Sequence, residues 1–233
     1  MSERWDVRTF DEVWRQKGEG NDEGYRPGRN RRVDAALRML RPGQRLLDVG
    51  CGSGVLAAQA RDRFAEVHGI DIAERAVTMA RQQGVEAAVV NLNVEPLPYA
   101  DAFFDAVTAL SSLQYVADLH AALAECARVL RPGGRFLMGV PNMRALWRLW
   151  ALGIRGRFPR TSLDEAGYDG GTLHYFTHRS LVGLLRRHGL VPGTSHGVFC
   201  IPRSAEAWTD RGAVGGLKRE FLSAEIIVDA AKP

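Results

Sequence analysis

Short apolar runs alternate with amphipathic stretches along most of the chain. Runs rich in apolar and β-branched residues lie at 46–49, 67–70, 85–92, 105–110 and 135–140. Between them apolar positions recur with helical spacing, as in residues 30–40, which follow the i, i+3, i+4, i+7 pattern. This alternation, without hairpin signals, predicts a doubly wound, mostly parallel α/β sheet with helices on both faces.

The remaining helices are predicted from their periodicity and end signals. They cover 55–63, 73–83, 119–130, and a segment from the N-cap Thr177 to near Gly189. Residues 131–134, Arg-Pro-Gly-Gly, are expected to close the helix before the last of these strands. The run 105–110 is almost uninterrupted by polar residues, as expected for a parallel strand covered on both faces.

Glycine occupies every second position in residues 50–54, directly after the first predicted strand. Because glycine lacks a Cβ and tolerates positive φ, a ligand can approach such a loop closely. The helix that follows points its free N–H groups at the same place. Residues 46–54 are therefore predicted to cradle a nucleotide or cofactor.

Spacing and charge narrow the choice of ligand. A dinucleotide fingerprint requires glycine where this chain has Val55, and a P-loop requires a lysine that is not present near the loop. Asp48, just before the loop, disfavours a diphosphate and favours a cation. Asp71 ends the next strand at an offset, about 20 residues, that suits a carboxylate binding both ribose hydroxyls. The predicted ligand is a positively charged nucleoside.

These motifs resemble those of the class I S-adenosylmethionine-dependent methyltransferases. Residues 48–54 match the family's glycine-rich motif, 69–71 its ribose-binding acid, and 93–105 a third motif of the small-molecule branch. The third motif usually begins with aspartate. Here it begins with Asn93, whose amide oxygen accepts from the adenine amino group without charge assistance. The resemblance is specific over about 46–141 and looser to the C-terminus.

The resemblance also implies a fold, a cofactor and a set of site residues. The fold is a Rossmann-like, seven-stranded sheet with an antiparallel edge pair at about 193–202 and 223–231, in a single domain covering 1–233. The cofactor is S-adenosyl-L-methionine. The implied cofactor-binding residues follow the predicted strands: Asp48, Gly50, Cys51, Gly52, Gly54, Asp71, Ile72, Asn93, Val94 and Ser111. Cys51 is expected to be a small packing residue and not a nucleophile.

Composition and charge add limits on location and partners. A chain of 233 residues with 45% hydrophobic content fits one globular domain. Without an N-terminal apolar region or a run of about 18 apolar residues, we expect a cytoplasmic protein. Its three scattered cysteines indicate neither a disulfide framework nor a CxxC metal site. The net charge of +4 is concentrated in 141–160, which holds five arginines and no acid, so no nucleic-acid partner is expected.

Residues 1–30 are polar and arginine-rich, with scattered aromatic residues. A short helix at about 10–16 and a glycine-rich loop are predicted. Two interpretations stay open. The segment is either a surface cover of the sheet or a lid over the cofactor, in which case Tyr25 joins the cofactor-binding residues and Arg26 and Arg29 reach the methionine carboxylate.

Residues 141–180 are predicted to form a helical insert that caps the substrate. On a helix over 143–155, one side carries Met143, Leu146, Trp147, Trp150 and Ile154, and the other carries Arg144, Arg148 and Arg155. Three interpretations compete. The helix is a cap packed on the domain with solvated arginines, a wall of the substrate pocket made by Trp147 or Trp150, or a membrane-surface helix that gives peripheral contact through 143–160.

Transfer of a methyl group from a sulfonium depends mainly on alignment, and a base is needed only for a poorly acidic acceptor. The candidates are His174 and Asp169, with His178 and Tyr115 behind them. A structural hydrogen bond to a loop backbone is the competing interpretation for His174. A metal site on His174, His178 and Asp169 is not predicted, because the Thr177 cap places the two histidines on different elements.

The leading hypothesis is therefore an S-adenosylmethionine-dependent methyltransferase acting on a small-molecule acceptor, with O-methylation favoured. Residues 111–114 suit a hydroxyl, carboxyl or carbon acceptor, and 170–181 resemble a segment of methyltransferases from glycan and natural-product pathways. The alternatives are an NAD-type oxidoreductase on a similar sheet and a non-catalytic, MetW-like regulatory protein. The acceptor itself is not predicted, and both a monomer and a homodimer fit the sequence.

Overall fold

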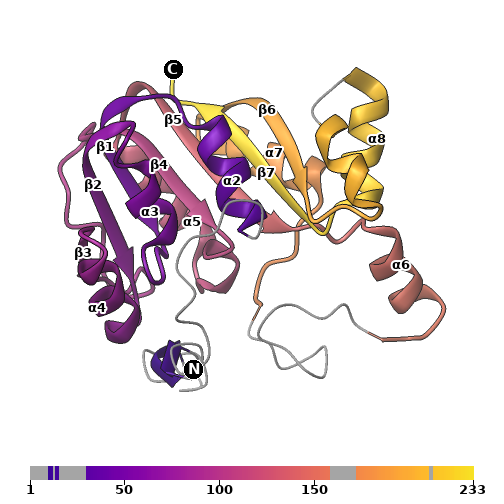
Figure 1. The fold of residues 1–233 in the computed structure, drawn as a ribbon, viewed down its shortest axis with the longest axis horizontal. Helices are drawn as coiled ribbons and strands as arrows, with labels where there is room; N and C mark the ends of the chain where they lie inside the picture. Colours follow the sequence, from indigo (N-terminus) through magenta and orange to yellow (C-terminus); the bar gives the residue numbers. More distant parts are fainter. Residues whose placement is uncertain (1–9, 13, 16–29, 158–171, 210–211) are drawn as a thin grey trace.

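The computed structural model describes residues 10–12, 14–15, 30–157, 172–209 and 212–233. At its centre is a seven-stranded sheet in the order β3-β2-β1-β4-β5-β7-β6 (Figure 1). The strands are β1 (Gly43–Val49), β2 (Phe64–Asp71), β3 (Glu86–Val89), β4 (Phe104–Leu110), β5 (Leu130–Pro141), β6 (Val191–Val198) and β7 (Glu225–Ala231). The first five are parallel, and β7 runs antiparallel to β5 and β6. The predicted fold class is confirmed.

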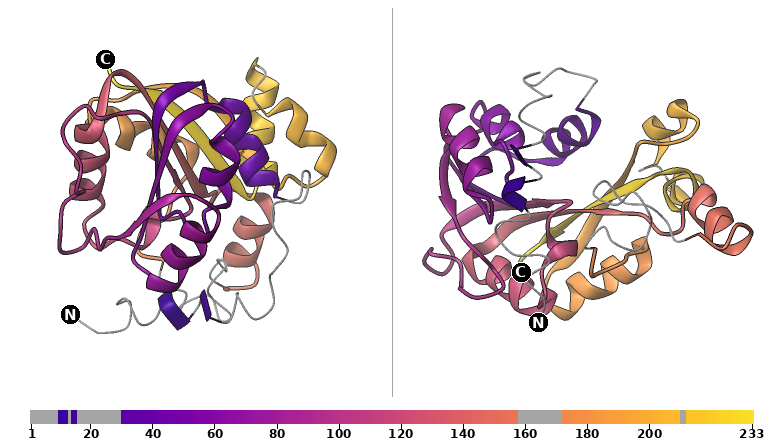
Figure 2. Two further views of the ribbon diagram at one scale, coloured as in Figure 1. Left: turned by 60° about the vertical axis from the view of Figure 1, so that its left-hand side comes forward. Right: turned by 90° about the horizontal axis from the view of Figure 1, so that it is seen from below.

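Helices cover both faces of the sheet (Figure 2). They are α2 (Arg31–Met39), α3 (Val55–Ala60), α4 (Glu74–Gln82), α5 (Leu119–Val129), α6 (Leu146–Gly153), α7 (His178–Arg187) and α8 (Gly212–Leu222), with 3-10 turns η2 (Leu113–Tyr115) and η3 (Arg203–Trp208). Residues 10–12 and 14–15 are also helical. Among the helices of the described ranges, none is both long and apolar enough to cross a bilayer.

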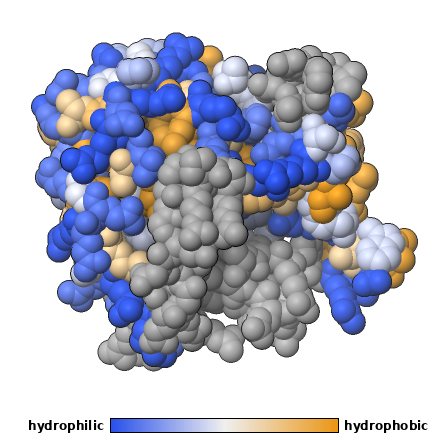
Figure 3. Space-filling model, viewed as in Figure 1, coloured by the Kyte–Doolittle hydropathy of each residue, from blue (hydrophilic) through white to orange (hydrophobic). Residues whose placement is uncertain are grey.

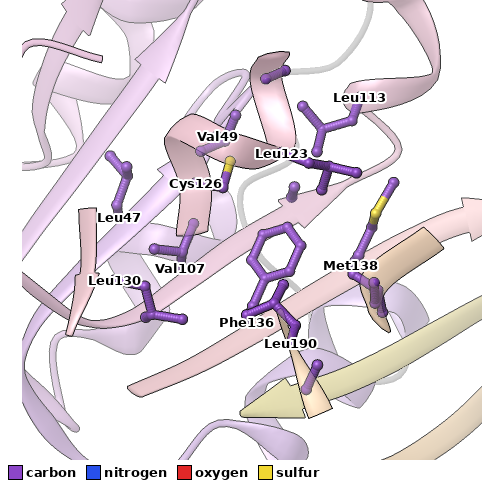
Figure 4. Close-up of a cluster of buried hydrophobic side chains, with 14 of the residues drawn as sticks. Leu47, Val49, Val107, Leu113, Leu123, Cys126, Leu130, Phe136, Met138 and Leu190 are labelled. Carbon is purple, nitrogen blue, oxygen red and sulfur yellow. The ribbon is translucent and has the colours of Figure 1, made fainter. Parts of the chain in front are cut away.

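Neighbouring residues on each strand enter different cores, because successive side chains of a strand point to opposite faces. Leu46 packs with α2, α3 and α4, whereas Leu47 packs with α5 and α7. On β5, Phe136 joins the α5 side and Leu137 the α2 side. Figure 4 shows the α5 side, where side chains from β1, β4 and β5 meet those of α5. The nearly continuous apolar runs thus build two cores on one sheet.

The order of the strands reverses between β1 and β4, since β1 is followed by β2 on one side and pairs with β4 on the other. In open parallel sheets, ligands bind at the carboxyl ends of the strands at such a switch point. The glycine loop follows β1 at this point. The fold therefore places the predicted cradle at the usual binding edge.

Several strand boundaries differ from the predictions: β6 spans Val191–Val198 and not about 193–202, and two further differences concern the start of β5 and the end of β3. Residues 131–134 do not separate α5 from the next strand, because β5 already begins at Leu130, which pairs with Phe104. The backbone of Gly133 and Gly134 hydrogen-bonds to Lys232, so the sheet continues across this irregular stretch. β3 ends at Val89 and not near residue 92, and a turn carries the chain from there to Asn93.

The structure bears on the three interpretations left open for the 143–155 helix, whose helical part is α6, Leu146–Gly153. The Arg148 guanidinium donates to the carbonyls of Asn142 and Ala224, so its side of the helix faces the protein. No residue of α6 is buried, and Leu146 and Ile154 are exposed. The carbonyls around the ends of β5 and β7 need donors, and an arginine supplies them where a leucine does not. A cap in which Arg148 is solvated is therefore excluded.

Candidate cofactor site

Asp48 is a buried carboxylate near the carboxyl end of β1. Its neighbour across the sheet is Thr108 of β4, whose Oγ1 donates to Asp48 Oδ1 at 2.7 Å. Burial, together with the nearby Asp71, raises the pKa of Asp48 to about 6, against the opposing effects of the Thr108 hydrogen bond and of Arg32. A carboxylate whose ionised form is this costly gains from a cationic ligand.

Asp71, at the end of β2, holds the glycine loop. Its Oδ2 accepts from the backbone N–H of Gly52 at 2.9 Å, and its Oδ1 accepts from the N–H of Ala73 at 3.0 Å. Each oxygen of a carboxylate can accept more than one hydrogen bond, so these two contacts do not by themselves exclude a ribose hydroxyl. The sequence suggested only the ligand role. The clamp between β2 and the loop comes from the structure.

The three glycines of the loop have different surroundings. Gly50 and Gly52 both have positive φ, 72° and 54°. A Cβ on Gly50 would lie 2.2 Å from Cβ of Ser112, so this glycine makes room for protein packing. A Cβ on Gly52 would meet the ring of Trp14, and one on Gly54 would meet Ala80 of α4. Of these three glycines, Gly50 and Gly54 pack against other parts of the central domain. Gly52 packs against Trp14 of the N-terminal segment.

Asn93, predicted to accept from the adenine amino group, and the predicted cofactor-binding residues Ile72 and Val94 lie in the turns after β2 and β3. Ile72 is half-buried, and Val94 is exposed to 79%, an apolar side chain open to a planar ligand. The Asn93 Oδ1 accepts from the N–H of Ala117 at 2.7 Å, which ties this turn to the loop after η2. One lone pair of that oxygen is thus used by the protein, and the other is available to the ligand.

Ser111 lies at the end of β4 in a charged network that the sequence did not indicate. Its backbone has φ 55°, and its Oγ is 2.6 Å from Nη1 of Arg32. The same guanidinium nitrogen donates to Oε1 of Glu225, at the start of β7, at 3.1 Å. Arg32 thus brings a positive charge to the binding edge, where it also acts on Asp48.

The helical residues of the N-terminal segment lie over the binding edge. The Trp14 ring packs against Gly52, and the Phe10 ring meets Tyr115 edge to face with centroids 5.7 Å apart. Asp11 Oδ1 accepts from the N–H of Arg75 at the start of α4. These three contacts reach the β1 loop, η2 and α4, which surround the cradle. They are the arrangement expected of a lid.

His174 lies in residues 172–177, which cross the loop after β4. Its Nε2 is 2.8 Å from the carbonyl oxygen of Val116, and since a carbonyl only accepts, Nε2 carries the proton and Nδ1 has a free lone pair. The N–H groups of Leu173 and His174 both donate to the carbonyl of Gln114. The imidazole thus makes the hydrogen bond to a loop backbone that the structural interpretation predicts. In the neutral imidazole, Nδ1 is then the nitrogen that can accept a proton.

A pocket of about 800 Å³ opens beside His174 between this segment, the start of α5 and α7. Its lining is apolar at Leu119, Phe176 and Leu184 and basic at Arg179 and Arg187. The size is in the range of small-molecule sites.

The other candidate residues have contacts that indicate a structural role, or they lie outside the described residues. His178 Nε2 contacts Ser195 Oγ at 2.9 Å, and burial followed by Arg219 lowers its pKa to about 4, so it is neutral at neutral pH and packs α7 on β6. Cys51 is buried, and its burial and the two nearby aspartates raise the pKa of its thiol, which suits packing. Within the described ranges no cluster of His, Cys, Asp and Glu has a metal-binding arrangement.

Asp169 and Tyr25, with Arg26 and Arg29, lie outside the described residues. Of the residues that sequence reasoning missed, Thr108 had a signal, as the one polar side chain in the middle of an apolar strand. Trp14 stood in a predicted helix without an assigned role. Arg32 had no local signal, because its partners are far away in the chain.

Known proteins resemble the chain most clearly over the cradle. A family model for a methyltransferase domain matches residues 47–138. The ubiquinone biosynthesis O-methyltransferase of Alkalilimnicola ehrlichii is 41% identical over 115 residues, 47% of this chain and 47% of that protein. The 27-O-demethylrifamycin SV methyltransferase of Amycolatopsis mediterranei is 41% identical over 114 residues, 45% of this chain and 41% of that protein. The match spans about half the length of these relatives.

Solved structures match almost the whole chain. The cyclase SpnF aligns with a TM-score of 0.67 at 24% identity, over 98% of this chain and 97% of that one. The geranyl diphosphate C-methyltransferase of Streptomyces coelicolor, solved with S-adenosyl-L-homocysteine, aligns with a TM-score of 0.63 at 18% identity, over 100% and 98%. At such identities the likeness concerns the fold alone. The family match covers residues 47–138, and the motifs stand in their places within it, so this part of the chain has the sequence and the fold of a methyltransferase domain.

Proposed function

We propose that this protein transfers a methyl group from S-adenosyl-L-methionine to a small-molecule acceptor, with oxygen as the favoured methylated atom. The observation that carries the proposal is the pair of buried acids, Asp48 and Asp71, at adjacent strand ends on either side of the glycine loop. Such a cradle suits a ligand that is both cationic and a nucleoside. Oxygen is favoured because the matched relatives are named O-methyltransferases.

The chain's own residues fit the parts of this cofactor. Asp48 suits the amino group, and Asp71 suits the ribose hydroxyls. Arg32 lies close enough to Asp48 to lower its pKa, and it suits the carboxylate of the cofactor's methionine part. The sequence had given that role to Arg26 and Arg29. Asn93, Val94 and Ile72 border the place for adenine, and Cys51 and Gly54 shape the loop.

When bound, the cofactor supplies an electrophilic methyl group on its sulfonium. The protein contributes alignment, which is worth up to about 7 to 11 kcal/mol when the reacting atoms are held at near-attack distance. Phe10 and Trp14 cover the edge, which excludes water from the site. His174 offers Nδ1 as a hydrogen-bond acceptor for an acceptor hydroxyl, since its Nε2 proton is held by Val116.

The pocket beside His174 is the proposed acceptor site. Its apolar lining and its two arginines suit a molecule with a hydrophobic body and an acidic group.

Calorimetric titration tests the cofactor assignment. Binding of S-adenosyl-L-homocysteine, without binding of nicotinamide dinucleotides, supports the proposal. The reverse pattern would instead favour an oxidoreductase on this fold. Cofactor binding without turnover on any phenolic, carboxylic or carbon acceptor, together with a partner that co-purifies in constant ratio, would favour a regulatory role.

A further inference from the structure

Helix α6 carries an apolar surface that no part of the described structure covers. It follows the carboxyl end of β5 and lies at the periphery of the molecule, at the lower right of Figure 1 and the far right in the right view of Figure 2. Five large apolar side chains in and beside it are exposed: Leu146 51%, Leu149 42%, Trp150 47%, Leu152 45% and Ile154 75%. Figure 3 shows apolar and hydrophilic residues side by side in this area. A concentration of this kind marks an interaction site.

The orientation of α6 is set by its arginines. Arg148 donates to the carbonyls of Asn142 and Ala224, and burial lowers its pKa, although not enough to discharge it. Arg144 pairs with Glu220 at 3.0 Å and lies over the Phe221 ring. Because Arg144 and Arg148 are bound to the body, the side of α6 that carries Leu146 and Trp150 is directed outward.

The outward side is bordered by positive charge. Residues 141–160 contain five arginines and no acid. Arg155 lies over the Trp150 ring at 4.1 Å from its centroid, and Arg157 is exposed just beyond the helix. An apolar stripe with tryptophan and flanking arginines is the composition of helices that lie in the interface of a bilayer.

The positive charge of Arg155 and Arg157 distinguishes two partners that could cover this helix, a second copy of the chain and a lipid surface. A second copy of the chain, docked through the same helix by a two-fold axis, would bring the Arg155 and Arg157 side chains of both copies together. A surface with negative headgroups around an apolar interior satisfies both the arginines and the leucines. We propose that α6 docks this protein on the surface of an anionic lipid bilayer, with Leu146, Trp150 and Ile154 inserted at the headgroup level.

Docking through α6 would bring the end of the sheet that carries the cradle close to the bilayer. Asn142 ends the β5 region at the same edge as the cradle, and α6 starts four residues later. The binding edge then lies near the bilayer, so an acceptor with a long apolar part reaches it without crossing water. This consequence rests on the proposed function, whereas the docking itself does not.

Vesicle flotation of the full chain tests the docking. The wild type is compared with the double variant Leu146→Ser with Ile154→Ser. The matched control is Val191→Ser, which removes an exposed apolar side chain at the start of β6, at the end of the strands opposite to the one that α6 follows. We expect the wild type and the control to float with phosphatidylglycerol vesicles and the double variant to bind about tenfold more weakly. Raising NaCl from about 0.1 M to about 0.5 M is expected to weaken wild-type binding severalfold.

Three results would overturn the proposal. They are no binding of the wild type to anionic vesicles, equal binding by all three proteins, and dimerisation that the double variant abolishes while vesicle binding is unaffected. Titration with S-adenosyl-L-homocysteine keeps the two proposals apart, since the double variant retains cofactor affinity if it is folded. Its thermal unfolding midpoint, expected to equal that of the wild type, verifies the fold.

Discussion

Two regions meet at the same end of the sheet and are built differently. The first is the cradle at the ends of β1, β2 and β4, and the second is the region after β5. At the first, acids and glycines stand at strand ends, and backbone hydrogen bonds fix them, as between Asp71 and Gly52. In the second, side chains reach distant carbonyls, as Arg148 reaches Ala224 across the chain. The first region has the local motif of a known family, and the second has none of comparable specificity.

This difference shows how one fold holds a constant ligand and varied partners. A nucleoside cradle made of backbone and strand ends is tied to the topology of the sheet. Helix α6 is attached to the body by polar contacts of Arg144 and Arg148, and none of its residues is buried, so the packing of the sheet constrains its composition little. The cyclase SpnF, which shares the fold at 24% identity, illustrates that the fold alone does not determine the reaction.

The largest effect on cofactor affinity is expected at Asp71, in the first of the two regions. Asp71→Ala removes the acceptor of the Gly52 and Ala73 N–H groups and the proposed partner of the ribose. We expect the affinity for S-adenosyl-L-homocysteine to fall about 100-fold, since hydrogen bonds to a charged group contribute roughly 1.5 to 3 kcal/mol each. Calorimetry measures it, with Glu74→Ala, an exposed acid three residues on, as the control. Unchanged affinity in Asp71→Ala would show that the cradle lies elsewhere.

The second prediction concerns charge at Asp48. Its pKa of about 6 lies above the usual value for aspartate, so the free protein takes up a proton here as the pH falls through 6. A cationic ligand binds the ionised form, and wild-type affinity is therefore expected to fall by up to about tenfold per pH unit below pH 6. Asp48→Asn should bind about tenfold more weakly at pH 8 and show a flatter profile between pH 5 and 8. Parallel profiles in the two proteins would mean that another group titrates.

A smaller effect is expected at the lid. Trp14→Ala removes the ring that packs on Gly52 and should weaken binding of S-adenosyl-L-homocysteine by about fivefold, from the loss of buried apolar contact. Trp150→Ala, at an exposed tryptophan on α6, is the matched control and should bind as the wild type does. Equal affinities for all three proteins would favour the interpretation of 1–30 as a surface cover.

The smallest effect on the cofactor is expected in the second region. His174→Ala should leave the affinity for S-adenosyl-L-homocysteine within about twofold, because the imidazole hydrogen-bonds to the Val116 carbonyl and not to the cradle. The free energy of unfolding should fall by about 1 kcal/mol, the usual contribution of one hydrogen bond, as measured by urea denaturation. A loss of cofactor affinity as large as that of Asp71→Ala would break the distinction between the two regions.

Most of the sheet was predictable, because local patterns carry it. Each strand from β1 to β5 begins within a few residues of an apolar run, and the alternation of Leu46 and Leu47 between two cores follows from strand geometry. The antiparallel pair β6 and β7 came from the family resemblance and is confirmed. The start of β5 at Leu130 was not predictable, since Pro132 and the two glycines read as a break until Lys232 supplies their backbone partners.

The candidate site was predictable where a residue's role depends on its own strand. Asp48, Gly50, Gly52 and Asp71 lie together because parallel strands end at one edge. The sequence left open which side of α6 faces outward, because periodicity shows that a helix has two sides without showing which one faces the protein. The carbonyls of Asn142 and Ala224 made that choice.

By itself, the sequence determined the sheet, the glycine loop and the two acids that indicate a cationic nucleoside, because hydrophobic period, glycine conformation and strand ends are local properties. Only the tertiary structure decided that Asp71 clamps the loop, that Trp14 covers Gly52, and that Arg32 joins Ser111 to Glu225. These last partners lie 79 and 193 residues from Arg32. Contacts over such separations depend on how the chain returns to the same edge, and no local pattern records that return.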